Sequence, residues 1–80
     1  MPKIKVYSSP ACAYCTSLKE FLKTNNIEFE DIDVSQNLVV QDEMIEKSGQ
    51  MSIPVTEIDG EIVVGFDRDK ICKLLNINRC

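Results

Sequence analysis

Two cysteines, Cys12 and Cys15, are separated by two residues at the point where an alternating apolar stretch gives way to a helical pattern. Only a thiolate attacks a disulfide, and the free N–H groups and the dipole of a helix start stabilise that anion. Cys12 falls at the very start of the expected helix, so we predict that it is the exposed nucleophile. Cys15 lies one turn further on, on the face of Leu18 and Leu22, so we predict that it is the buried thiol.

This arrangement predicts thiol–disulfide exchange. Cys12 attacks a substrate disulfide to form a mixed disulfide, and Cys15 then attacks the Cys12 sulfur and releases the reduced substrate. Three other interpretations stay open, namely an inert buried pair, a structural disulfide and a metal-binding module. A zinc site needs two further ligands, but the sequence has no His, and Cys72 and Cys80 match no zinc spacing.

Length and composition restrict the class of protein. The chain has 80 residues, 44% hydrophobic and 28% charged, which predicts a single globular domain over 1–80. A net charge of -4 without a Lys/Arg cluster argues against nucleic acid as a partner. No apolar run approaches the ~20 residues that cross a bilayer, and the first residues lack the apolar core of a signal peptide. We therefore expect a cytoplasmic protein, where thiols are kept reduced and a structural disulfide is disfavoured.

The hydrophobic periodicity predicts strands over 3–7, 27–34, 55–58 and 61–64, and helices over 13–24, 38–49 and 67–77. The first two strands flank a helix and should therefore be parallel. Asp59 and Gly60 predict a tight hairpin between the last two strands, because both turn positions take positive φ. The result is an α/β fold of order β-α-β-α-β-β-α, with a four-stranded mixed sheet flanked by three helices.

Three stretches carry a resemblance to a known family: "CAYC" at the first helix, "SIPV" before the third strand and "VVGFDRD" before the last helix. Together with the order of the elements, they resemble the glutaredoxins. The chain is most similar to the short bacterial glutaredoxin-like proteins, near the redoxins that donate electrons to ribonucleotide reductase. The resemblance covers nearly the whole chain. It implies a thioredoxin-like fold and a dithiol–disulfide oxidoreductase without a tightly bound cofactor.

The resemblance also implies roles for individual residues. Cys12 matches the nucleophile and Cys15 the resolving cysteine. The bond before Pro54 is expected to be cis, with the preceding backbone pairing with the bound substrate. The residues implied to bind the substrate or glutathione are Tyr14, Ile53, Pro54, Gly65, Phe66 and Asp67. Asp67 could cap the last helix instead of binding glutathione, or do both. The implied partners are disulfide-containing proteins, and we expect the protein to act on them as a monomer.

Several positions depart from the family pattern. Ala13 replaces the proline of the Cys-Pro-Tyr-Cys motif, and Val64 replaces one of two glycines. Ser8, Ser9 and Pro10 stand where glutathione-using members carry a basic residue. These changes favour a thioredoxin-reductase-type flavoenzyme as the reductant. However, the chain has no Trp, which the ribonucleotide-reductase redoxins typically carry before the last helix, so glutathione stays the alternative.

Two alternatives concern the cysteines. Some glutaredoxins bridge a [2Fe–2S] cluster between two protomers through the first Cys and glutathione, which visible absorbance after anaerobic reconstitution would reveal. A redox sensor is the other, with Cys72 or Cys80 joining the active pair. Lys19, four residues after Cys15, is expected to be a solvated helix lysine.

Overall fold

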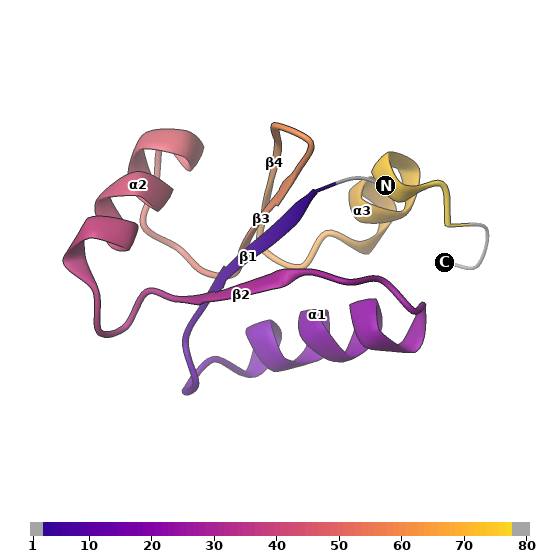
Figure 1. The fold of residues 1–80 in the computed structure, drawn as a ribbon, viewed down its shortest axis with the longest axis horizontal. Coiled ribbons are helices and arrows are strands. Elements are labelled where there is room, and N and C mark those ends of the chain that lie inside the picture. The colour runs from indigo at the N-terminus through magenta and orange to yellow at the C-terminus, as the bar shows by residue number, and fades with distance from the viewer. Residues whose placement is uncertain (1–2, 78–80) are drawn as a thin grey trace.

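The computed structural model describes residues 3–77 and contains seven helices and strands over that range (Figure 1). Their order is β-α-β-α-β-β-α, as predicted. The elements are β1 (Ile4–Ser8), α1 (Ala13–Thr24), β2 (Glu30–Asp33), α2 (Leu38–Ser48), β3 (Val55–Ile58), β4 (Glu61–Val64) and α3 (Arg68–Leu75).

The four strands form one mixed sheet in the order β2-β1-β3-β4. β1 pairs with β2 in parallel, and the β1–β3 and β3–β4 pairs are antiparallel. The carboxyl ends of β1, β2 and β4 therefore meet the amino end of β3 at one end of the sheet. We call this the thiol end, marked by Ser8, Asp33, Val55 and Val64, because the chain runs from β1 directly into the loop that carries Cys12.

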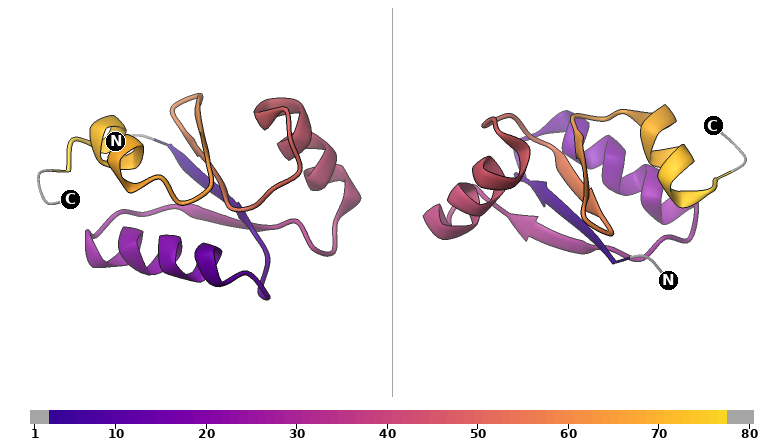
Figure 2. Two further views of the ribbon diagram at one scale, coloured as in Figure 1. Left: turned by 180° about the vertical axis from the view of Figure 1, so that it is seen from behind. Right: turned by 90° about the horizontal axis from the view of Figure 1, so that it is seen from above.

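The helices cover both faces of the sheet (Figures 1 and 2). Leu18 and Leu22 of α1 and Ile71 of α3 pack in one buried cluster with Val6 and Ile58. On the other face, Met44 of α2 packs with a second buried cluster that holds Tyr7, Val34 and Val55. The sheet is thus the middle layer of three, and the predicted mixed sheet flanked by helices is confirmed.

The second strand is shorter than its alternating pattern predicted. The pattern indicated a strand over 27–34, but the ladder covers only Glu30–Asp33, because its neighbour β1 begins at Ile4 and pairs from Lys5 onward. The N–H of Ile27 donates instead to the carbonyl of Leu22 at 2.9 Å and closes the end of α1. The apolar alternation reflects packing, since Ile27 and Phe29 lie partly buried against the α1–α3 core.

The Asp59–Gly60 turn and the end of α2 at Gly49 lie where the sequence indicated. Asp59 and Gly60 have φ of 48° and 89°, which confirms the tight hairpin between β3 and β4. Asn37 caps α2 through its side chain, and Gly49 ends that helix in the left-handed conformation. Within residues 3–77, no helix has the length and apolar character that a membrane crossing requires.

Helix α2 is joined to the sheet by a polar cluster around Lys47. Its Nζ lies 2.6 Å from Glu57 Oε1 on β3 and 3.1 Å from Glu43 Oε1 on α2 itself. The hydroxyl of the buried Tyr7 donates to Glu43 Oε1 at 3.0 Å. These contacts connect α2 to β1 and β3, and so they position the segment 49–54, which returns the chain to the thiol end.

Candidate active site

The loop after β1 delivers Cys12 to the first turn of α1. Cys12 is the N-cap of the helix, with φ -96° and ψ 115°, and its Sγ accepts the N–H of Cys15 at 3.1 Å. Its own N–H donates to the carbonyl of Ser9 at 3.2 Å. The sulfur therefore occupies the place that a capping oxygen usually takes, next to the positive end of the helix dipole.

The two sulfurs differ in exposure as the sequence predicted. Both are free thiols, Cys12 is partly exposed, and Cys15 is fully buried at 0% exposure. Burial raises the pKa of the Cys15 thiol to about 11, and its contact with Cys12 raises the pKa further, while the backbone N–H of Ser9 and the charge of Lys19 oppose the rise. Cys15 is thus held as a protonated thiol at neutral pH.

The raised pKa of Cys15 predicts a loss of stability of the reduced protein at high pH. Its pKa is about 11 in the fold and 9.0 in an ordinary setting, so stability is complete below about pH 9 and falls as the pH rises toward 11. By about pH 10.5 the loss should approach roughly 2 kcal/mol. Urea unfolding of the reduced protein at neutral pH and about pH 10.5 measures it. The Cys15→Ala variant lacks this thiol, so its free energy of unfolding should fall by roughly 2 kcal/mol less than that of the parent over the same pH range. An equal fall in both proteins would contradict the prediction.

The Ile53–Pro54 step lies beside the Cys12 loop. Its peptide bond is cis, as the resemblance implied, and Pro54 is buried. Val55 follows immediately and pairs with Tyr7 at the carboxyl end of β1, so residues 53–54 flank the start of the Cys12 loop. The carbonyl of Pro54 accepts the N–H of Gly65 at 2.8 Å. The three motif stretches therefore meet at the thiol end of the sheet.

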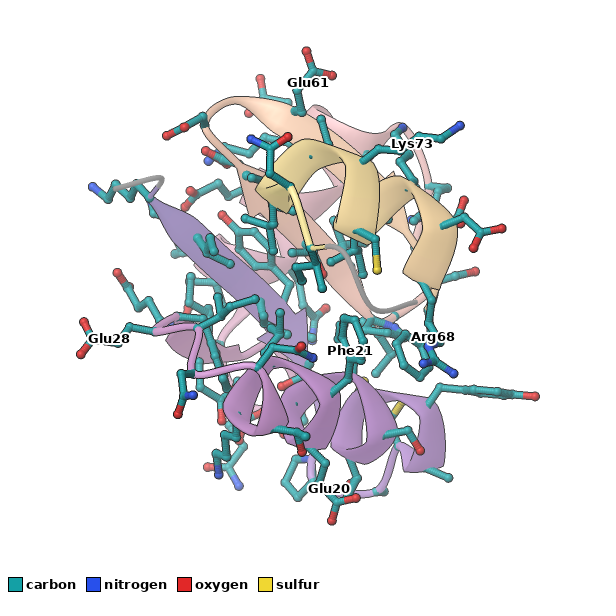
Figure 3. The ribbon with its side chains drawn as sticks, turned by 90° about the vertical axis from the view of Figure 1, so that its right-hand side faces the viewer. Glu20, Phe21, Glu28, Glu61, Arg68 and Lys73 are labelled. Atoms are coloured by element: carbon teal, nitrogen blue, oxygen red, sulfur yellow. The ribbon has the colours of Figure 1, made fainter. Side chains whose placement is uncertain are left out.

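The residues after β4 complete this end of the molecule. Asp67 is the N-cap of α3, and its Oδ1 accepts the N–H of Lys70 at 3.2 Å, which confirms the capping role. Phe66 packs against Phe21 of α1 with ring centroids 5.8 Å apart. The guanidinium of Arg68 lies 5.2 Å from the centroid of the Phe21 ring, and Figure 3 shows the two side chains together between α1 and α3. An open hollow of about 410 Å³ lies over Val64 and residues 66–69.

Comparison with known proteins agrees with this geometry. The family model for glutaredoxin matches residues 4–63, from β1 into β4. The chain belongs to the glutaredoxin family. The family and the fold support a function of the thiol–disulfide oxidoreductase kind.

Individual relatives cover most of this glutaredoxin. It is 44% identical over 72 residues to an uncharacterized glutaredoxin-like 8.6 kDa protein in the rubredoxin operon of Clostridium pasteurianum, covering 90% of this chain and 96% of the relative. Glutaredoxin 3 of Escherichia coli is 28% identical, over 84% of this chain and 81% of the relative. The thioredoxin-like protein BC3987, crystallised as a point mutant, superimposes with a TM-score of 0.89 at 41% identity, covering 98% of this chain and all of that one. The thioredoxin-like fold is confirmed.

The prediction that Lys19 is a solvated lysine of this glutaredoxin was wrong. Its Nζ lies 2.9 Å from Asp31 Oδ2 on β2, and the other oxygen of Asp31 accepts the hydroxyl of the buried Ser8 at 2.9 Å. The spacing of residues along the sequence could not predict this ion pair. Lys19 and Asp31 come together only after β2 pairs with β1 and α1 packs against the sheet. The pair places a positive charge one turn after Cys15, where it favours the thiolate of Cys15.

The remaining site predictions have different outcomes. Tyr14 is 71% exposed in the first turn of α1, two positions after Cys12, and its role as a substrate contact stays a prediction. In the described part of the chain, no three Cys, His, Asp or Glu side chains gather into a metal-binding group. Cys72 is buried on α3, and Cys80 lies outside the described residues, so the redox-sensor alternative stays a prediction.

Proposed function

We propose that this glutaredoxin is a small electron carrier that reduces disulfides with the Cys12–Cys15 dithiol. One observation carries the proposal: a partly exposed sulfur caps α1, and a fully buried thiol follows one turn later on the same helix. The N–H of Cys15 donates to Cys12 Sγ at 3.1 Å, while burial raises the pKa of Cys15, so Cys12 is the sulfur placed to attack first.

The reaction proceeds in two exchanges. The Cys12 thiolate attacks one sulfur of the substrate disulfide, forms a Cys12–substrate disulfide and expels the other sulfur as a thiolate. Cys15 then loses its proton, and its thiolate attacks Cys12 Sγ. The substrate leaves as a thiolate, and a Cys12–Cys15 disulfide remains. Two electrons pass from the dithiol to the substrate, and the two thiolates released take up two protons.

The substrate would be held by the residues around Cys12 at the thiol end of the sheet. The backbone before Pro54 is a pairing edge for an extended substrate segment, because residues 53–54 flank the Cys12 loop. The proposed contact residues are Tyr14, Ile53, Pro54, Gly65, Phe66 and Asp67. Asp67 and the start of α3 offer N–H groups and a carboxylate to the charged end of a glutathione molecule.

After each cycle, an external reductant must convert the Cys12–Cys15 disulfide back to the dithiol. The two candidate donors are glutathione and a thioredoxin-reductase-type flavoenzyme. Two molecules of glutathione, which leave as glutathione disulfide, or one reduced flavoenzyme deliver the two electrons that the Cys12–Cys15 disulfide requires. We further propose that a single domain over 1–80 acts as a cytoplasmic monomer on disulfide-containing proteins, with no resident cofactor.

One parallel assay tests the proposed function and separates the donors. The oxidised protein is supplied with glutathione, glutathione reductase and NADPH in one cuvette, and with thioredoxin reductase and NADPH in the other. We expect NADPH oxidation that depends on this protein with one donor system and is at least about tenfold slower with the other. The matched control is Ser17→Ala on the exposed side of α1, which should behave as the parent. If NADPH is consumed with neither donor, the proposed function is wrong.

A further inference from the structure

A second cavity adjoins the Cys12 loop on the side of α2. It has a volume of about 280 Å³ and lies between Ser9, Val34 after β2, Met44 of α2, and Met51 and Ile53 ahead of β3. Val34 and Met44, which are 5% and 2% exposed, give it a buried apolar lining together with Ile45, while Ser35 and Gln41 add uncharged polar groups. None of the side chains that line it is charged. The cavity is smaller than the roughly 300–1,000 Å³ of sites for drug-sized ligands, so it suits one or two side chains.

The cavity adjoins the proposed reaction centre through Ser9. The carbonyl of Ser9 accepts the N–H of Cys12 at 3.2 Å, so the wall of the cavity and the nucleophile belong to one turn of chain. Ile53 lies on the other wall and precedes the cis bond to Pro54. Any molecule joined to Cys12 through a disulfide therefore has its neighbouring groups within reach of this cavity.

One exposed apolar side chain lies at the edge of the cavity. Among the described residues, the large apolar side chains that are exposed are Tyr14, Leu38, Val39, Met51 and Val64, and of these Met51 lines the cavity. Met51 is 74% exposed and forms the rim of the cavity.

We propose that this cavity is a specificity subsite for an aliphatic side chain next to the reacting cysteine of a protein disulfide. The inference rests on the proposed function and names its substrate class. Glutathione flanks its cysteine with a γ-glutamyl group and a glycine, which carry two carboxylates and no aliphatic side chain. An uncharged cavity supplies no cation for a carboxylate and favours a leucine or a methionine instead.

Peptide disulfides with a chromophoric leaving group test the subsite. Blocked pentapeptides carry Leu, Ala or Asp on both sides of a central cysteine that is joined to thionitrobenzoate. In the Cys15→Ser background, the Cys12 thiolate attacks the peptide sulfur and expels the coloured thiolate, and the Cys12–peptide disulfide persists. Each rate is divided by the rate of the same peptide with dithiothreitol, which removes differences in intrinsic reactivity. We expect the Leu peptide to react roughly tenfold faster than the Ala peptide, and the Asp peptide to be the slowest.

Two further variants assign the preference to the cavity. Met51→Asp should bring the Leu-to-Ala ratio close to one while leaving the rate with the glutathione–thionitrobenzoate disulfide unchanged, a readout that also reports correct folding. Leu38→Asp is the matched control, because Leu38 is 75% exposed, as Met51 is, but does not line the cavity, and it should keep the ratio. Three results would each overturn the subsite. The first is equal rates for the Leu and Ala peptides, and the second is a Leu-to-Ala ratio that Met51→Asp leaves unchanged. The third is a ratio that Leu38→Asp also brings close to one. If no disulfide reacts, the proposed function fails first.

Discussion

Replacing Cys12 with serine should abolish turnover with every disulfide substrate and either reductant. A serine hydroxyl cannot form the mixed disulfide on which both exchanges depend, so we expect a fall in rate on the order of a thousandfold or more. The measurement is NADPH oxidation in the donor system that supports the parent. Because serine is itself a favourable N-cap, the free energy of unfolding should change by no more than about 1 kcal/mol.

The small change in stability makes the result interpretable. Urea unfolding of Cys12→Ser and of the parent under reducing conditions shows whether α1 keeps its cap, and Ser17→Ala serves as a neutral variant on the same helix. Residual turnover in a well-folded Cys12→Ser protein would contradict the assignment of the nucleophile. It would direct attention to the other cysteines of the chain.

Replacing Cys15 with serine should separate two kinds of substrate. Cys12 still attacks a protein disulfide, but without the buried thiol the mixed disulfide is not resolved from within, so the covalent complex should accumulate and turnover should fall by roughly a hundredfold or more. Glutathione mixed disulfides should still be reduced when glutathione is present, since a second glutathione attacks the Cys12–glutathione disulfide directly. Mass spectrometry of the trapped complex and a parallel deglutathionylation assay measure the two effects.

The control for this experiment is a variant with both cysteines replaced, in which no complex should form. Accumulation of the complex in the double variant would mean that another sulfur attacks the substrate. Unchanged turnover of protein disulfides by Cys15→Ser would mean that the buried thiol is not the resolving group. In that case its burial one turn after Cys12 would serve packing alone.

The fold could be predicted wherever local sequence decides the conformation. Asp59 and Gly60 adopt the positive φ that an Asp-Gly turn indicates, and Gly49 ends α2 in the left-handed conformation that its missing side chain permits. The limits of β2 could not be predicted in this way. The length of a strand depends on where its partner strand begins and ends. The alternation of residues 27–34 contains no information about the extent of β1, so it could not predict where the pairing stops.

The candidate site shows the same division. The difference between Cys12 and Cys15 follows from positions on a single helix, so helical periodicity was sufficient to predict it. The Lys19–Asp31 pair joins α1 to β2, and the cavity near Met51 draws on segments far apart in the chain. Contacts of this kind depend on how the layers pack, and no local pattern of charge or hydrophobicity specifies them.

The acidic character of β2 has a consequence for how copies of this protein meet. β2 is an edge strand of the sheet, and the unpaired backbone groups of an edge strand can recruit a strand from another molecule. Glu30, Asp31 and Asp33 give it three carboxylates in four residues. Two such edges brought together would oppose like charges, which destabilises cross-strand pairing. Edge-to-edge association of two molecules through β2 is therefore disfavoured. This leaves the end of the sheet near Cys12 as the place where we propose that a substrate chain binds.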